Sequence, residues 1–192
     1  PSALPSFDSE DWADLLRYAR AATALAPLGA TLDAAIDHGR LRSTWRAYRT
    51  RAKIAAALGE PSAPYWKRGV RAFPRNAALT LGLLTALERA GDTAAILDLV
   101  EGWRRYDGTL VDGALAFATR AQAMGDARAA DRVLEHTRRL SQRHPEGLRS
   151  IRDYVNARGD LTLGLELSKQ ICQLSPRDAV ARRRLGDQYY QM

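Results

Sequence analysis

The sequence predicts an all-α fold, an α-solenoid of about five antiparallel helix pairs. The first observation is a Gly-Asp pair that recurs every 34 residues, at Gly91-Asp92, Gly125-Asp126 and Gly159-Asp160. A fixed interval of this size is typical of stacked helix-turn-helix units. The second observation is that apolar residues between these pairs recur at steps of three and four, which places them on one helix face. The length of 192 residues accommodates such a stack without a second globular domain.

Residues 1–40 are predicted to form an N-terminal helical hairpin or cap. A helix begins at Asp8 or Ser9, where a capping side chain precedes an acidic first turn. Its apolar stripe consists of Trp12, Leu15, Leu16, Ala19 and Ala22. We expect Pro27 and Gly29 to end this helix, and a shorter helix to follow over residues 31–38.

Residues 41–76 are predicted to form a degenerate repeat. One helix is expected over residues 41–58 and a second over residues 64–73, which ends because Pro74 disfavours helical geometry in the residue before it. Trp45 and Tyr48 lie on the apolar stripe of the first helix, so we expect both in the core. Trp66 and Trp103, each in a second helix, are also predicted to be core residues.

Residues 77–192 contain the regular units, at 77–110, 111–144 and 145–178, with a partial unit at 179–192. In each unit the glycine of the Gly-Asp pair is expected to end one helix and the aspartate to cap the next. Three positions are apolar in every unit that contains them. These residues are Leu83, Phe117, Ile151 and Leu185, then Leu99, Val133 and Leu167, then Tyr106, Leu140 and Leu174. Because one helix pair cannot bury its own apolar face, these positions should pack against neighbouring pairs.

The unit resembles the tetratricopeptide repeat (TPR), with its Leu-Gly in the first helix, Gly-Asp at the turn, small residues at the helix contact and a closing proline. The last unit matches best, since Leu185, Gly186 and Tyr189 follow Pro176 in the spacing of that family. The matching small residues elsewhere are Ala118, Ala130 and Gly164. The departures are Leu84, Ile96 and Arg152 in place of small residues, and Gly108 and Gln142 in place of proline. The resemblance implies a right-handed superhelix that binds a protein or peptide along its concave face.

The resemblance also implies which residues line that groove. They are Leu81, Thr85, Glu88, Leu115, Thr119, Gln122, Arg149, Asp153, Asn156, Arg183, Asp187 and Tyr190. Their character changes from apolar to charged along the chain, which suits an extended ligand with one apolar and one polar end. Arg149 and Asp153 are four residues apart and are expected to pair with each other, as are Arg183 and Asp187. The alternative is that all of these are ordinary solvated residues.

One subclass of such repeats holds a peptide's terminal carboxylate between lysine, asparagine and arginine side chains. Here Leu81 and Leu115 stand where that clamp needs a cation, and Thr85 and Thr119 stand where it needs an amide. The sequence therefore argues against a carboxylate clamp.

The net charge of +7 is concentrated upstream of the regular units. Between Arg40 and Arg75 there are ten Lys or Arg residues and one acid, Glu60. The predicted basic patch consists of Arg42, Arg46, Arg49, Lys53, Lys67, Arg68 and Arg71. Such a patch attracts polyanions or an anionic membrane surface, although no nucleic-acid-binding motif accompanies it. The alternative is a solvated face in an arginine-rich composition.

These features predict a non-catalytic TPR-like scaffold that binds a protein or peptide. A second hypothesis is an accessory repeat module of a larger enzyme, such as a transferase that builds or modifies a polysaccharide, whose basic surface holds an anionic polymer or membrane. The start at Pro1 without a methionine and the end at Met192 inside a unit suggest a piece of a longer chain.

The sequence contains no pattern that predicts catalysis, a cofactor or a metal. No nucleophile is paired with a base, no glycine-rich phosphate loop occurs, and His38, His136, His144 and Cys172 lack ligand spacing. Carboxylate pairs such as Asp11 and Asp14, or Asp33 and Asp37, are explained by capping and solubility. With no signal peptide or transmembrane segment and one cysteine, the sequence favours a cytoplasmic, bacterial protein.

Overall fold

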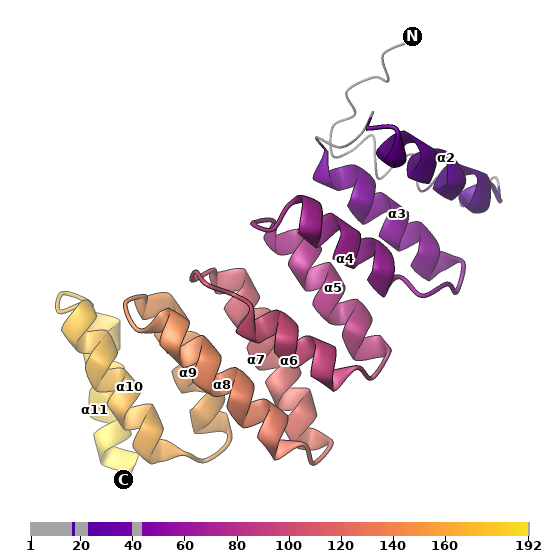
Figure 1. Ribbon diagram of the computed structural model, residues 1–192. Helices are drawn as coiled ribbons and strands as arrows, with labels where there is room; N and C mark the ends of the chain where they lie inside the picture. Colours follow the sequence, from indigo (N-terminus) through magenta and orange to yellow (C-terminus); the bar gives the residue numbers. More distant parts are fainter. Residues whose placement is uncertain (1–16, 18–22, 40–43, 192) are drawn as a thin grey trace. The chain divides into compact units, whose positions relative to one another are not determined.

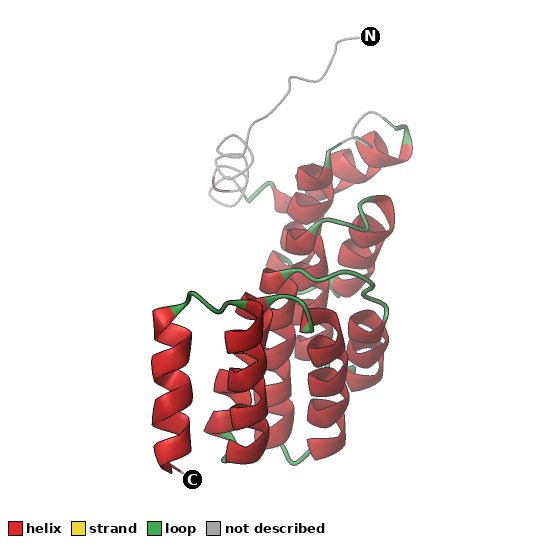
Figure 2. Ribbon diagram, turned by 90° about the vertical axis from the view of Figure 1, so that its left-hand side faces the viewer, coloured by secondary structure: helices red, strands yellow, loops and turns green. Residues whose placement is uncertain are grey.

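The computed structural model describes residue 17 and residues 23–39 and 44–191. All regular secondary structure within these ranges is α-helical (Figure 1, Figure 2). The chain divides into two compact units, residues 1–90 and residues 91–192. The predicted helix that starts at Asp8 or Ser9 lies outside the described residues, except for Arg17. Leu41, Arg42 and Met192 also lie outside them.

Residues 23–39 and 44–90 of the first unit form four helices, each packed against the next. They are α2 (Leu25–Asp37), α3 (Trp45–Ala57), α4 (Ala63–Ala72) and α5 (Ala77–Arg89). The core between them contains Ile36, Tyr48, Ile54, Trp66, Leu79 and Leu83, all under 9% exposed. Tyr48 and Trp66 are therefore core residues, as predicted.

The predicted helix end at Pro27 and Gly29 is wrong, because both residues lie inside α2. Pro27 is in the first turn, where a helix needs no backbone N–H donor and tolerates proline. Gly29 is buried, and a Cβ there would lie 3.3 Å from Cγ2 of Ile54 on α3. The glycine thus permits a close approach of α2 to α3. From the sequence alone, a glycine with this role cannot be distinguished from one that ends a helix. The predicted end at Gly39 is confirmed by its φ of 78° directly after α2.

A second close contact joins α4 to α5. The ring of Trp66 lies directly over Gly82, where an added Cβ would be no more than 2.5 Å from three ring carbons. Trp66 is 8% exposed, so its ring fills the space that a side chain at position 82 would occupy. Gly82 is therefore required by packing and not by backbone conformation.

The second unit consists of six helices in two layers. They are α6 (Thr93–Glu101), α7 (Gly108–Ala123), α8 (Ala127–Ser141), α9 (Pro145–Ala157), α10 (Leu161–Leu174) and α11 (Ala179–Gln191). In sequence order, α7 packs against α8, α9 against α10, and α10 against α11. One layer contains α6, α8 and α10, and the other contains α7, α9 and α11 (Figure 1). The chain is thus an all-α solenoid of TPR-like helix pairs.

The three Gly-Asp turns have the predicted geometry. Gly91, Gly125 and Gly159 have φ values of 69°, 86° and 81°, in the left-handed region that glycine adopts without steric cost. Each following aspartate accepts a hydrogen bond from a backbone N–H three residues later, at 3.0 Å in every case. These pairs are Asp92 with Ala95, Asp126 with Ala129, and Asp160 with Leu163. The glycine ends one helix and the aspartate caps the next, as expected.

Five of the ten predicted apolar positions are buried, and four more are half-buried. Leu83, Phe117 and Ile151 are 4%, 3% and 0% exposed, and Val133 and Leu167 are fully buried. In contrast, Leu174 is 41% exposed at the end of α10. The second helices therefore pack tightly through their middle, while their last turn is more open.

Candidate partner-binding site

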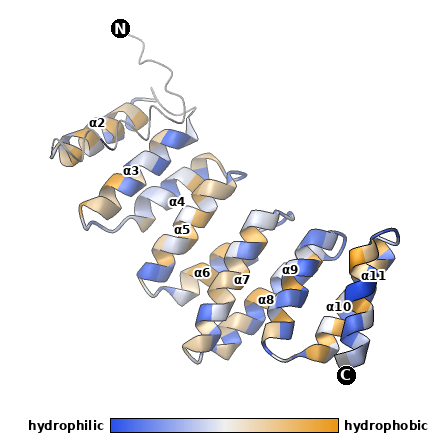
Figure 3. Cartoon of the chain, turned by 180° about the vertical axis from the view of Figure 1, so that it is seen from behind, coloured by the Kyte–Doolittle hydropathy of each residue, from blue (hydrophilic) through white to orange (hydrophobic). Residues whose placement is uncertain are grey.

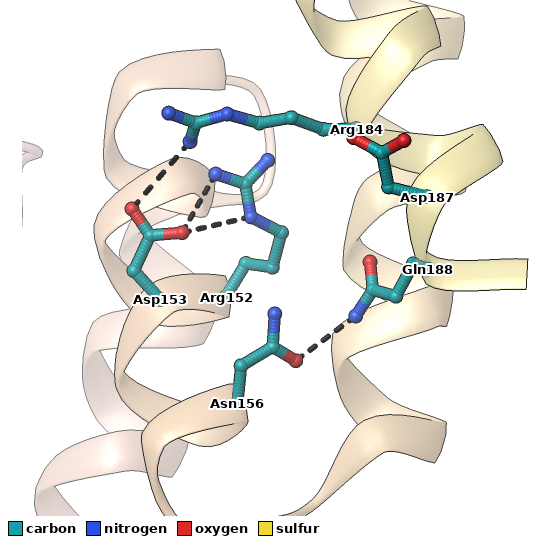
Figure 4. Close-up of a pocket in the computed structure, with 6 residues that line it drawn as sticks. All are labelled: Arg152, Asp153, Asn156, Arg184, Asp187 and Gln188. Atoms are coloured by element: carbon teal, nitrogen blue, oxygen red, sulfur yellow. Dashed lines mark hydrogen bonds and ion pairs between the residues drawn. The ribbon is translucent and has the colours of Figure 1, made fainter. Parts of the chain in front are cut away.

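An open polar pocket lies between α9 and α11 in the second unit (Figure 4). Its volume is about 360 Å³, and its walls are Arg152, Asp153, Asn156, Arg184, Asp187 and Gln188. Three of these, Asp153, Asn156 and Asp187, were predicted to line a groove. On each helix the lining residues are one, three or four positions apart, which places them on one side of that helix. The lining sides of α9 and α11 meet across the pocket.

Arg152 is the least expected residue of the pocket. It stands where the TPR-like pattern has a small residue, yet its side chain is only 3% exposed. Its Nε and Nη2 atoms both donate to Oδ1 of Asp153, at 3.0 and 2.7 Å. Asp153 itself is 60% exposed, and its Oδ2 lies 3.8 Å from Nη1 of Arg184 on α11. The carboxylate of Asp153 therefore lies between two guanidinium groups, one from each helix (Figure 4).

A chain of hydrogen bonds fixes the other side of the pocket. The hydroxyl of Ser168 on α10 donates to Oε1 of Gln188 at 2.5 Å, and Nε2 of Gln188 donates to Oδ1 of Asn156 at 2.9 Å. Both Ser168 and Gln188 are buried. Because Oδ1 of Asn156 faces Gln188, the amide nitrogen of Asn156 points toward Arg152 (Figure 4). The network therefore presents a fixed donor to the pocket.

Gly164 on α10 makes this network possible. A Cβ at position 164 would overlap the amide oxygen of Asn156 and would lie 2.9 Å from its Cγ. The small residue that the sequence pattern placed here is thus explained by the polar contact above it. Arg184, Gln188 and Ser168 were missed from the sequence, although the four-residue step from Arg184 to Gln188 places both on the face that contains Asp187.

The predicted pairing of Arg149 with Asp153 is wrong. Arg149 instead pairs with Glu146 on its own helix and with Asp178 before α11. Asp178 is held in place because its Oδ1 also accepts the backbone N–H groups of Val180 and Ala181, and these bonds lower the pKa of its carboxyl. The hydrogen bond to Glu146 raises the pKa of Arg149. Arg149 therefore joins α9 to the start of α11, and Asp153 is left to the two arginines of the pocket.

The remaining predicted groove residues have different surroundings. Leu115 on α7 is 6% exposed and belongs to the core, and Thr119 donates to its carbonyl oxygen at 2.9 Å. Gln122, Arg183 and Tyr190 are exposed, Tyr190 to 94%. Leu81, Thr85 and Glu88 lie on α5 in the first unit. The structure thus gathers predicted residues of α9 and α11 into one pocket, while the wider groove stays a prediction. The layer that contains these two helices shows hydrophilic segments on both of them (Figure 3).

The predicted basic patch spans two helices of the first unit. Arg46, Arg49 and Lys53 lie on α3, Lys67, Arg68 and Arg71 lie on α4, and Arg42 is outside the described residues. Arg68 pairs with Asp37 of α2. Trp45, predicted to be a core residue, is only half-buried at the start of α3. The guanidinium carbons of Arg46 and Arg49 lie 5.1 and 5.8 Å from the centre of its ring.

Two further features of the described part bear on the sequence predictions. Trp103 is half-buried and lies just beyond the end of α6, so its predicted place within a second helix is wrong. Its carbonyl oxygen is 3.2 Å from Nε2 of the buried His136. Among the described residues, no three or more His, Cys, Asp or Glu side chains are grouped to hold a metal ion, and no helix is long and apolar enough to cross a bilayer.

Comparisons with known proteins give structural likeness at low identity. No family model and no curated protein matches the sequence. The chain is similar to YrrB, a TPR protein described as having an unusual peptide-binding site, at 13% identity and TM-score 0.44, covering 92% of this chain and 91% of that one. It is similar to a TPR protein from Parabacteroides merdae at 11% identity and TM-score 0.44, covering 94% and 72%. It is also similar to a chain of the APC/C hetero-tetramer Cut9-Hcn1, at 11% identity and TM-score 0.43, covering 96% and 36%.

Proposed function

We propose that this chain is a non-catalytic scaffold that binds a protein or peptide partner along the layer of α7, α9 and α11. The observation that carries the proposal is the pocket between α9 and α11, where predicted groove residues from both helices present polar groups to an open space of about 360 Å³. The pocket is held by ion pairs and hydrogen bonds within the protein. Binding therefore requires little ordering of the receptor, which favours affinity.

The chemistry of the pocket suits a polar segment of a partner chain. Asn156 offers an amide donor, Arg184 offers an exposed guanidinium, and Asp187 offers an exposed carboxylate. The two cations, Arg152 and Arg184, are balanced by Asp153 and Asp187, so the pocket has no excess of either charge. A partner segment with both donors and acceptors, such as peptide backbone with amide or mixed-charge side chains, complements this arrangement.

Exposed residues beside the pocket extend the surface. Tyr190 on α11 is 94% exposed, and tyrosine is one of the residue types that contribute most to protein interfaces. Arg183 and Gln122, from the predicted groove, are also exposed on the same layer. We include all three in the proposed binding surface, together with Thr119 of α7. Leu81, Thr85 and Glu88 belong to the first unit and stay a prediction from the sequence. Leu115 supports this surface from the core.

The test uses a charge exchange at the pocket rim. A random peptide library displayed on phage is selected against the full chain, and enriched peptides are measured by fluorescence anisotropy. The variant Arg184→Glu with Asp187→Arg preserves net charge but reverses both rim charges. We expect this variant to bind the enriched peptides at least tenfold more weakly, a loss of about 1.4 kcal/mol of binding free energy.

The matched control exchanges one arginine and one aspartate elsewhere in the second unit, Arg128→Glu with Asp98→Arg, both exposed. We expect it to bind the peptides like the wild type. If no peptide family is enriched, or if both variants bind equally well, the pocket is not the binding site.

The hypothesis of an accessory module for a larger, polysaccharide-modifying enzyme stays a prediction. It depends on the basic residues of the first unit, which do not contribute to the pocket.

A further inference from the structure

The outer face of α3 carries three cations in one line. Arg46, Arg49 and Lys53 are spaced by three and four residues, which places them on one face of the helix. At a rise of about 1.5 Å per residue they span about 10 Å. The buried positions of α3 include Tyr48 and Arg51, which lie between these cations in sequence but on another side of the helix. We call Arg46, Arg49 and Lys53 the α3 stripe.

No described carboxylate neutralises the α3 stripe. The nearby acids are used elsewhere in the first unit, since Asp33 and Glu60 both pair with the buried Arg51. Asp37 pairs with Arg68 of α4. Within the described ranges, Arg46, Arg49 and Lys53 have no acidic partner. The positive charge of this face is therefore available to a ligand.

Trp45 orders part of the α3 stripe. Its ring lies within 5.1 and 5.8 Å of the guanidinium carbons of Arg46 and Arg49, the range of a cation–π contact. A guanidinium group held at an aromatic ring keeps free N–H groups, which bind a phosphate through two parallel hydrogen bonds. Burial lowers the pKa of Lys53, and repulsion by the nearby charge of Arg49 lowers this pKa further. A bound anion would relieve that repulsion.

We propose that the α3 stripe binds the phosphate backbone of a nucleic acid, without reading its sequence. Phosphates repeated along a strand match a line of cations on a rigid helix, and two of the three cations are arginines suited to phosphate. A membrane surface fits less well, because docking to lipid usually adds apolar side chains beside the cations. Among the described residues of the first unit, one large apolar side chain is exposed. It is Leu58, which is 40% exposed and lies beyond the end of α3.

This surface is separate from the pocket, because α3 belongs to the first unit and α9 and α11 to the second. The proposal therefore stands or falls independently of peptide binding. Contacts limited to phosphates predict weak affinity, with a Kd of about 1 to 100 μM at physiological salt.

The experiment measures anisotropy of a labelled DNA of about 20 nucleotides, single-stranded and duplex, at salt from about 50 to 250 mM. The stripe variant is Arg46→Ser with Arg49→Ser and Lys53→Ser in the full chain. The control removes the same charge from exposed arginines of the second unit, as Arg128→Ser with Arg143→Ser and Arg177→Ser. Circular dichroism checks that both variants retain their helix content.

We expect the stripe variant to lose about 2 to 3 units from the slope of log K against log salt, at about 0.7 to 0.9 per phosphate contact. We expect the control to lose less than one unit. Arg46→Lys with Arg49→Lys should keep the slope and still lose affinity several-fold, because lysine cannot make the paired hydrogen bonds.

Three outcomes would overturn the proposal. The first is an equal loss in the control, which would mean that net charge alone binds DNA. The second is wild-type protein that does not bind either form of DNA. The third is binding that depends on the stripe for phosphatidylserine vesicles or polygalacturonate but not for DNA, which would assign this face to a membrane or an anionic polysaccharide.

Discussion

Gly82→Ala is expected to destabilise the first unit, although alanine favours helix more than glycine does. At position 82 the new methyl group would lie no more than 2.5 Å from three carbons of the Trp66 ring. Because non-bonded carbons pack best at about 3.5 to 4.0 Å, the ring or one helix must move by about 1 Å. Trp66 is 8% exposed and packs between α4 and α5, so neither movement is free of strain.

The magnitude follows from two opposing effects. Overpacking of a buried site costs about 1 to 3 kcal/mol, and the rigidity of an indole ring places Gly82→Ala near the upper end. The helix propensity of alanine returns about 1 kcal/mol. We therefore expect a net loss of about 2 kcal/mol, which lowers the melting temperature by about 8 to 16 °C for a unit of this size.

The assay is thermal and urea denaturation followed by circular dichroism, with Gly186→Ala as the matched control. Gly186 is also inside a helix, but a Cβ there has nothing within 4 Å, so this change should gain up to about 1 kcal/mol. In a Trp66→Leu background, Gly82→Ala should cost much less stability than in the wild type, because the clashing ring is gone and alanine favours helix. A Gly82→Ala protein as stable as the wild type, or an equal loss in both backgrounds, would refute the reasoning.

Three further changes test other parts of the structure. Arg51→Met removes the partner of Asp33 at 2.8 Å and should lower the free energy of unfolding by about 1 to 3 kcal/mol in denaturant titrations, because a partly buried carboxylate loses its cation. A stability equal to that of the wild type would contradict this. Burial lowers the pKa of His136, so the folded state takes up its proton less readily than the unfolded state, and stability should fall as pH drops below about 6.5. His136→Gln should flatten this dependence, and unchanged slopes would contradict the assignment. Asp126→Ala removes a helix cap and should lower stability by about 1 kcal/mol, while Asp126→Asn should be nearly neutral.

The fold could be predicted from the sequence wherever local geometry decides it. Each Gly-Asp turn needs one residue with a positive φ and then one whose side chain caps the next helix. Few residue types satisfy either requirement. Gly29 shows where the same logic fails, because a glycine that ends a helix and a glycine that admits a neighbouring helix look alike without tertiary contacts. Pro27 reinforced the wrong interpretation because proline both ends helices and begins them.

The candidate site was predicted only in part for a similar reason. Asp153, Asn156 and Asp187 could be found because the resemblance to tetratricopeptide repeats implies which positions of each unit face the groove. Whether Asp153 pairs with Arg149 or with Arg152 depends on the position of Asp178 before the next helix, which spacing within one helix does not contain. The burial of Arg152 is likewise a tertiary property, since hydropathy alone places an arginine in solvent.

The Gly-Asp turns also have a practical consequence for anyone who wishes to modify the protein. At Gly91, Gly125 and Gly159 nothing lies within 4 Å of the missing Cβ, and each turn is stabilised by its own aspartate. Exposed loop tips of this kind tolerate inserted residues, provided that the insertion keeps the glycine and its capping aspartate adjacent. An epitope tag or fluorophore inserted at Gly125 or Gly159 would therefore label the second unit while leaving α9, α11 and their pocket residues unaltered in sequence.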